Sequence, residues 1–401
     1  MKKITSFLFI CLIFLPRVYA DNDKSGFRIK DRSIEFGLNA QVGFTNDFLA
    51  ASDFSKKIFV LDLDKIEKGI KLNLDADISP LYFNFNYKNK WGLGLSINAD
   101  AYGIIGLSGK MLSLSQTVNE KSDISAALFA DAGIPAFFHL KKFKIKLRPA
   151  LYFPVFYTVS DVSYTFTSEE DKGTELYLSY EVNVFSAFSM KKYNGITASP
   201  GVDFQLGLEY PLSSALGLKD KFFLLDFDIG LDIINIPLMS SSMSDYMKIS
   251  GKAGTKEPII FGGKDDFDMG DLLDINSDDT TYGKKELKVR RPFKMLAWTD
   301  WRPLGIQLLT VTPEIGFAIN PLYIKSFSME AGIKTRLDIF NLFRATFGVG
   351  FYDRLWKNSL DLALNLRAFE LDIGADLRSQ SFAKSWTGSG FGVNLGLKFG
   401  W

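Results

Sequence analysis

The sequence predicts an all-β fold, a transmembrane antiparallel β-barrel of 14–16 strands formed by one domain. Long stretches alternate apolar and polar residues with period 2, which places the apolar side chains on one face of a strand. Aromatic residues make up 14% of the 401 residues, yet beyond residue 20 no segment carries about 18 consecutive apolar residues, as a membrane helix would. Apolar residues diluted by a polar inner face are typical of a membrane barrel. A large soluble β-sandwich would show similar strands and stays an alternative.

The first 20 residues have the composition of a secretory signal peptide. Lys2 and Lys3 precede an apolar run at 4–15, and the small residue Ala20 ends the segment. The sequence therefore predicts a cleaved signal peptide at 1–20 and a barrel at 21–401. The single cysteine, Cys11, lies in the apolar run, so the exported chain would have no disulfide and no thiol nucleophile. The full chain has 47 Lys+Arg and 46 Asp+Glu, a balance that argues against nucleic acid as a partner.

The alternation predicts the individual strands. At Pro80 it shifts by one residue, which indicates a bulge within one long strand rather than two strands. Dividing the apolar run at Pro154 gives sixteen strands, and undoing that division together with a second merger gives fourteen. Long connections at about 45–69, 104–122 and 240–284 fall on the outer side. The expected strands are about 33–44, 70–87, 91–103, 123–138, 142–153, 155–167, 174–189, 200–210, 221–237, 285–298, 303–319, 326–339, 342–352, 355–366, 368–378 and 390–401.

Charged residues within these strands are the candidate functional residues. A carboxylate facing lipid at mid-depth costs several kcal/mol, so charged residues are expected to face the barrel interior. One strand face carries Lys142, Lys144, Lys146 and Arg148. Mixed charges can line an aqueous channel or neutralise one another in a closed interior, and spacing alone does not choose between these. The candidate lumen-lining residues are Asp226, Asp228, Asp232, Lys334, Arg336, Asp338, Glu370, Asp372, Asp376 and Arg378.

Enzymatic and metal chemistry find little support. The only histidine, His139, is expected at a periplasmic turn, and no Gly-x-Ser-x-Gly pattern accompanies it. Seven aspartates within 265–279 could hold calcium loosely, although Gly270 takes the third ligand position of the EF-hand pattern. We expect no catalytic residue, no metal and no cofactor, and regard the aspartate-rich stretch as a solvated outer loop.

The final strand carries a resemblance to a known class of protein. Residues 390–401 place six apolar side chains on one face and end on an aromatic residue; those six are Phe391, Val393, Leu395, Leu397, Phe399 and Trp401. This pattern resembles the closing strand of bacterial outer-membrane β-barrels. The resemblance covers the whole chain and implies an outer-membrane location. It also implies that the barrel-assembly machinery reads Phe399 and Trp401.

The resemblance to any one transport family is weaker. Size and aromatic content are similar to those of porins and of the long-chain fatty-acid transporters, but the Asn-Pro-Ala hatch motif of the latter is absent. Expected partners are outer-membrane lipid, the assembly machinery and a small-molecule solute. The predicted function is a passive, porin-like channel for small solutes. The alternative is a surface-exposed structural or adhesive barrel that acts through its outer loops.

Overall fold

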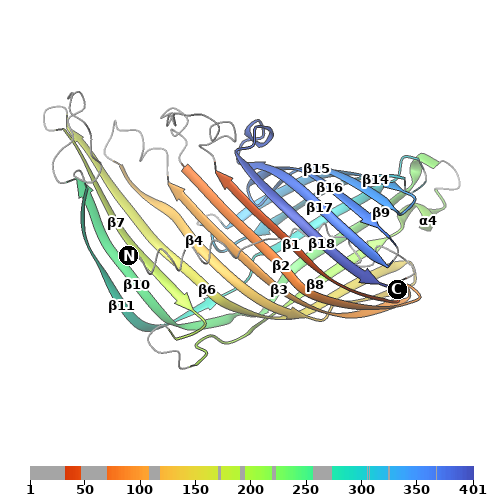
Figure 1. The fold of residues 1–401 in the computed structure, drawn as a ribbon, viewed down its shortest axis with the longest axis horizontal. Helices are drawn as coiled ribbons and strands as arrows, with labels where there is room; N and C mark the ends of the chain where they lie inside the picture. The colour runs from red at the N-terminus through yellow and green to blue at the C-terminus, as the bar shows by residue number, and fades with distance from the viewer. Residues whose placement is uncertain are drawn as a thin grey trace.

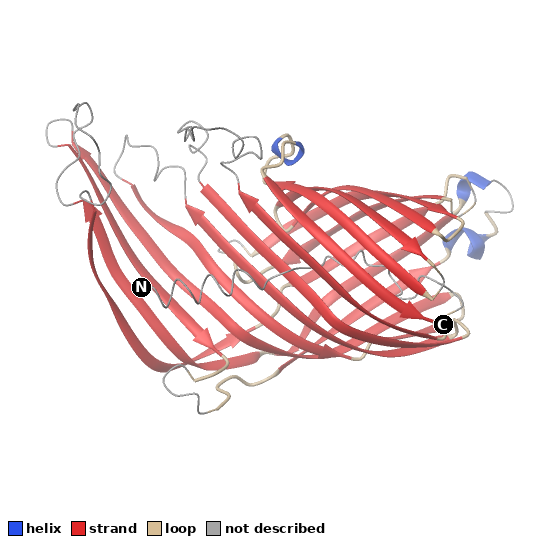
Figure 2. Ribbon diagram, viewed as in Figure 1, coloured by secondary structure: helices blue, strands red, loops and turns tan. Residues whose placement is uncertain are grey.

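One antiparallel sheet accounts for most of the structure (Figure 1, Figure 2). The computed structural model describes residues 32–46, 70–107, 118–169, 173–189, 195–218, 223–255, 273–304, 306, 308–323, 326–366 and 368–401. The expected signal peptide at 1–20 lies outside the described residues. No helix in these ranges is both long and apolar enough to span a membrane.

The strands follow one another along the chain with few other elements between them. The first nine are β1 (Ile34–Asn46), β2 (Ile70–Tyr87), β3 (Trp91–Leu107), β4 (Val118–Gly133), β5 (Ala136–Leu140), β6 (Phe143–Glu169), β7 (Gly173–Ser186), β8 (Gly201–Tyr210) and β9 (Phe227–Met239). The second nine are β10 (Ser241–Thr255), β11 (Leu273–Val289), β12 (Phe293–Trp301), β13 (Leu309–Ile319), β14 (Phe327–Ile339), β15 (Phe343–Tyr352), β16 (Leu355–Asn365), β17 (Phe369–Ser379) and β18 (Gly390–Gly400). Short helices are α4 (Leu212–Leu216), η2 (Phe223–Leu225) and η3 (Lys384–Trp386).

The sheet closes into a barrel of 14 strands. Closure joins β1 to β18 in register from Glu35↔Gly400 to Thr45↔Gly390. In the described part of the chain the long strand β11 pairs only with β10. We call one passage of the chain through the barrel wall a crossing. Four crossings are each made of two consecutive strand segments, which reduces the eighteen segments to fourteen; the pairs are β4 with β5, β7 with β8, β9 with β10 and β11 with β12. We call the end of the barrel that holds Trp401 the terminal end, and the opposite end the outer end.

The expected sixteen strands reduce to fourteen through two mergers. The division at Pro154 is wrong, because β6 runs unbroken from Phe143 to Glu169. A register shift opposite Pro154, between Leu128 and Phe129 of β4, accommodates the proline. The expected strands 174–189 and 200–210 are the second merger: β7 pairs with one half of β6 and β8 with the other half. Together they make a single crossing.

The Pro80 bulge is confirmed. Strand β2 is continuous over 18 residues, and its register with β3 shifts between Ile78 and Leu81. A tight turn at 88–90 follows β2, with positive φ angles at Lys88 (47°) and Asn89 (54°). Such angles suit a two-residue hairpin turn, whose twist matches that of the strands it joins.

The expectation of one long loop at 240–284 is wrong. Residues 241–255 and 273–289 form β10 and β11. Strand β10 pairs with β7 and β11 pairs with β10, and the three lie at the left of the barrel in Figure 1. Their alternation was missed because Ser, Lys, Asp and Thr occupy both faces, so no apolar stripe marks them. The expected loops 45–69 and 104–122 are likewise shorter, since β1 continues to Asn46 and β3 to Leu107. Residues 47–69, 108–117 and 256–272 lie outside the described part of the chain.

Candidate functional site: the charged interior of the barrel

The two faces of the closed sheet differ in chemistry. Outward-facing residues are large, apolar and exposed, as Leu93, Leu95 and Ile97 on β3 illustrate. The opposite face buries charged groups, and Glu370 and Arg378 of β17 are both 0% exposed. Ionic side chains are buried only when they are paired. The interior of this barrel is therefore a network of ion pairs.

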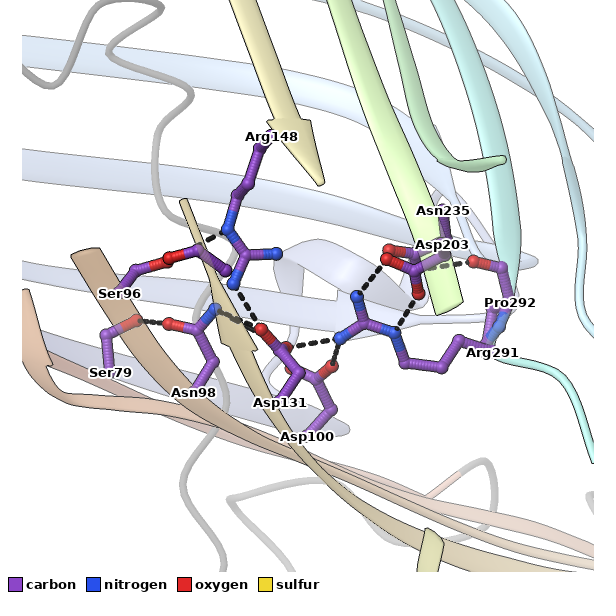
Figure 3. Close-up of polar contacts among 11 residues, drawn as sticks. Ser79, Ser96, Asn98, Asp100, Asp131, Arg148, Asp203, Asn235, Arg291 and Pro292 are labelled. Atoms are coloured by element: carbon purple, nitrogen blue, oxygen red, sulfur yellow. Dashed lines mark hydrogen bonds and ion pairs between the residues drawn. The ribbon is translucent and has the colours of Figure 1, made fainter. Parts of the chain in front are cut away.

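Arg291 is the centre of a group of ion pairs that joins four parts of the sheet (Figure 3). It lies between β11 and β12, and its guanidinium group makes a two-pronged contact with Asp203 of β8: Nε lies 2.7 Å and Nη2 3.0 Å from the two carboxylate oxygens. Nη1 lies 3.1 Å from Asp100 of β3 and also bonds Asp131 of β4. Counted around the barrel, four other crossings lie between β3 and the β11–β12 crossing. A single side chain thus bridges the interior at this level.

A second arginine extends the same network. Arg148 of β6 pairs with Asp131, and its Nε donates to Ser96 Oγ at 2.9 Å. Asn98 Nδ2 donates to Asp131 at 3.1 Å, and Asn98 Oδ1 accepts from Ser79 Oγ at 2.7 Å. Asp131 therefore accepts from two guanidinium groups and one carboxamide. Bidentate and charge-assisted bonds of this kind are the strong ones, so the group is expected to be rigid.

An apolar layer lies next to the Arg291 network, toward the outer end. Leu322 reaches this layer from the turn between β13 and β14, where Ser125 Oγ of β4 donates to its carbonyl at 2.7 Å. Tyr152 joins the two layers, because its hydroxyl donates to Val289 O at 2.9 Å while the Arg291 guanidinium lies 5.6 Å from its ring centre. The buried members are Tyr102, Ile104, Ala127, Phe129, Tyr152, Tyr157, Phe185, Met243, Val289 and Leu322.

Three of the candidate lumen residues lie near the terminal end. Arg302, just after β12, donates to Asp226 through Nε and Nη2, both at 3.0 Å, and to Asp228 at 2.7 Å. Burial alone would lower the pKa of the Arg302 guanidinium, but the bonds and charges of the two carboxylates raise it above its usual range. Asp232 accepts from Trp298 Nε1 at 2.8 Å.

The β14 candidates share the enclosed face and are paired with neighbouring strands. Lys334 Nζ lies 3.3 Å from Glu314, and Arg336 Nη2 lies 3.4 Å from Thr310 Oγ1. Asp338 accepts from Arg344 at 2.9 Å. Cross-strand partners such as these depend on the register between β13, β14 and β15.

The β17 candidates also face inward. Glu370 and Asp372 lie 3.3 and 3.5 Å from Lys398 Nζ of β18. Asp376 and Asp75 of β2 both pair with Arg378, which is fully buried. The candidate residues thus lie beside or on β9, on β14 and on β17, and Asp338 of β14 and Glu370 of β17 line the same pocket.

Sequence reasoning missed the most central group. Arg148 was placed on a charged strand face by the alternation, but Arg291, Asp131 and Asp203 were not singled out. Arg291 precedes Pro292 at a break between two strand segments, where no alternation survives to show which way a side chain points. Its partners come from β3, β4 and β8, and only the closure of the barrel brings these strands together.

Solved outer-membrane barrels have a similar fold. The crystal structure of the P. putida toluene transporter TodX superposes with a TM-score of 0.51 at 11% sequence identity, covering 92% of this chain and 90% of that chain. The fold is that of an outer-membrane β-barrel. A second structure of the same transporter gives a TM-score of 0.50 at 10% identity, covering 96% of this chain and 94% of that chain. No protein-family model matches the sequence, and no curated protein does either.

The closing strand of this outer-membrane barrel carries the two aromatic residues expected to act in assembly. Phe399 stacks on Phe36 of β1 with ring centres 5.5 Å apart, and Trp401 meets the same ring edge-on at 6.3 Å. Trp401 is 67% exposed. Both side chains are on the outward face at the terminal end, and their recognition by the assembly machinery stays a prediction.

His139 lies in β5 at the terminal end. Its side chain is exposed, its ring meets Phe137 edge-on, and Nδ1 lies 3.4 Å from Lys90 O. Among the described residues no group of three or more histidine, cysteine, aspartate or glutamate side chains could hold a metal ion. Residues 265–272 of the aspartate-rich stretch lie outside the described part of the chain, and residues 273–279 belong to strand β11 rather than to a loop.

Proposed function

We propose that this chain is an outer-membrane barrel that lets small solutes pass passively through its interior. The observation that carries the proposal is the closed sheet, which has an apolar outward face and a charged inward face. A polar lumen inside an apolar band is the arrangement of barrel channels. The similar fold of a toluene transporter supports a transport role for small molecules.

The passage in this proposal is narrow. The Arg291 network and the apolar layer around Leu322 occupy successive levels of the interior. Hydrophobic constrictions restrict hydrated ions, and charged rings select among them. Lumen-lining roles are proposed for Asp226, Asp228, Asp232, Lys334, Arg336, Asp338, Glu370, Asp372, Asp376 and Arg378.

Several further features belong to the same proposal. Residues 1–20 act as a signal peptide that is removed on export. The barrel-assembly machinery recognises the strand that ends in Phe399 and Trp401. Catalysis has no part in the proposal, because the exposed His139 has the Lys90 carbonyl and the Phe137 ring as its neighbours, an arrangement without a nucleophile.

Swelling of liposomes that contain the refolded barrel tests this function. Liposomes loaded with a large sugar polymer and diluted into isosmotic solutions of small neutral or charged solutes should swell, and faster for smaller solutes. Liposomes with heat-denatured protein serve as the control. Folded barrel that produces no swelling with any small solute would overturn the proposal.

A further inference from the structure

Two adjacent turns at the terminal end carry an exposed group of lysines. Lys88 and Lys90 belong to the turn between β2 and β3, and Lys141 and Lys142 belong to the turn between β5 and β6. The two turns are in contact, because His139 N donates to Lys90 O at 3.2 Å and β3 pairs with β5 directly beside them. All four lysine side chains are exposed. We call these four residues the lysine patch.

No nearby carboxylate balances the charge of the lysine patch. Residues 78–99 and 132–149, which include both turns and their flanking strands, contain neither aspartate nor glutamate. Within the described part of the chain, no carboxylate pairs with a lysine of the patch. The inward face of β6 differs, since Lys144 and Lys146 lie 3.9 and 3.1 Å from Glu209. The lysine patch is therefore a local surplus of positive charge.

Aromatic rings surround the lysine patch on the outward face. The rings of Tyr87 and Trp91 lie 5.8 Å apart beside the first turn, and Phe143 packs on Tyr210 at 4.6 Å beside the second. Lys88 Nζ lies 5.6 Å from the centre of the Tyr87 ring, so its charge is at the outward surface. Exposed aromatic rings concentrate where a membrane meets water. The lysine patch is therefore expected at the level of the lipid headgroups.

Two other turns at the terminal end have a different character. Phe340 and Leu342 are exposed in the turn between β14 and β15, where Asp338 and Arg344 form an ion pair. Leu366 is exposed in the turn between β16 and β17. These apolar turns suit any lipid, whereas the lysine patch favours a negatively charged one.

We propose that the lysine patch binds the headgroup of an anionic phospholipid, of the phosphatidylglycerol class, in the membrane leaflet at the terminal end. The phosphate accepts hydrogen bonds from the ammonium groups, and the acyl chains lie along the exposed rings of Tyr87, Trp91 and Phe143. Basic side chains near an anionic membrane surface attract it, and salt screens the attraction. A zwitterionic headgroup is held less tightly, because its own cationic group meets the same lysines. This inference concerns the contact with lipid and does not depend on the passage of solutes.

Competition between phosphatidylglycerol and phosphatidylcholine with identical acyl chains tests the inference. The refolded barrel in detergent micelles is mixed with equal amounts of the two lipids, and native mass spectrometry counts the molecules of each that stay bound. Phosphatidylglycerol should be preferred by roughly five- to tenfold, the range expected for a few exposed lysines. High salt should reduce that preference.

Replacing Lys88, Lys90 and Lys141 together by glutamine should reduce the preference to less than about twofold. Replacing the same three by arginine should keep the preference, because the positive charge remains. Lys142 stays unchanged in both variants, since its Nζ donates to Ala215 O at 3.1 Å and contacts α4.

Three exposed lysines of β11 supply the matched control, namely Lys284, Lys285 and Lys288. Glutamine at these positions removes the same amount of charge away from the terminal end, and the preference should persist. Heat-modifiable migration in gels verifies that each variant is folded. If the triple glutamine variant of the patch does not fold, the double variant Lys88→Gln/Lys141→Gln takes its place and should lose part of the preference.

Equal binding of the two lipids by the wild-type barrel, or an unchanged preference in the folded glutamine variant of the patch, would overturn the inference. An equal loss in the β11 control would also overturn it, because the preference would then follow net charge rather than position. Inorganic phosphate at the same concentration as the lipid should leave phosphatidylglycerol bound. Complete displacement by inorganic phosphate would identify a site for free phosphate and reject the lipid.

Discussion

Arg291 shows how one side chain can hold together distant parts of a closed sheet. Its guanidinium group meets carboxylates from three strands, and Asp131 is shared with Arg148. Burial of so many charges is costly, and the attraction between them offsets that cost only while every partner is present. The interior is therefore sensitive to the loss of a single guanidinium group.

Replacing Arg291 with methionine is expected to destabilise the barrel by about 3–5 kcal/mol, because Asp100, Asp131 and Asp203 would be left close together without their shared cation. Urea unfolding of the refolded protein in lipid vesicles measures the effect. The neighbouring Arg290 is exposed and bonds Ser240 at 2.7 Å, so Arg290→Met should change the stability by less than about 0.5 kcal/mol. Equal losses of unfolding free energy for the two substitutions would show that Arg291 does not stabilise the barrel more than an exposed arginine does.

Elements were predictable from the sequence where lipid contacts one face, and less so elsewhere. Strand β18 was recognisable because its apolar face alternates with Gly392, Asn394 and Gly396. Strands β10 and β11 were missed because no apolar stripe distinguishes their outward face. At Pro154 the sequence predicted a strand end that does not exist, because a proline at a bulge does not end a strand. Inward faces followed from alternation, but the ion-pair partners did not, because they depend on register and closure.

The turn between β13 and β14 is the element most suited to restrict passage. Leu322→Ala is expected to shorten the side chain that closes the apolar layer and to raise the rate of liposome swelling several-fold for small solutes. Leu366→Ala, at an exposed turn of the terminal end, provides the control and should leave the rate unchanged. An unaltered rate in the folded Leu322 variant would mean that the solute path avoids this turn.

At the scale of the whole molecule, fourteen strands form a barrel whose outside is apolar and whose inside is a set of ionic groups separated by an apolar layer. The fold class was predictable because most strands, though not β10 and β11, repeat the same alternation. The arrangement of ionic and apolar layers in the interior was not predictable. Arg291 lies at a strand break, Leu322 in a turn and Tyr152 within a strand, and the three are far apart in the sequence. Under the proposed function, solutes therefore cross the barrel by a narrow path rather than a wide pore.

Single-channel recording of the refolded barrel in a planar lipid bilayer tests this account most directly. A narrow interior path predicts discrete current steps, smaller than those of an open general porin of similar size, that grow in the folded Leu322→Ala variant. Large steps in the wild-type protein would contradict the closed layers at Arg291 and Leu322. A folded, inserted barrel with no current in either form would contradict the passage itself.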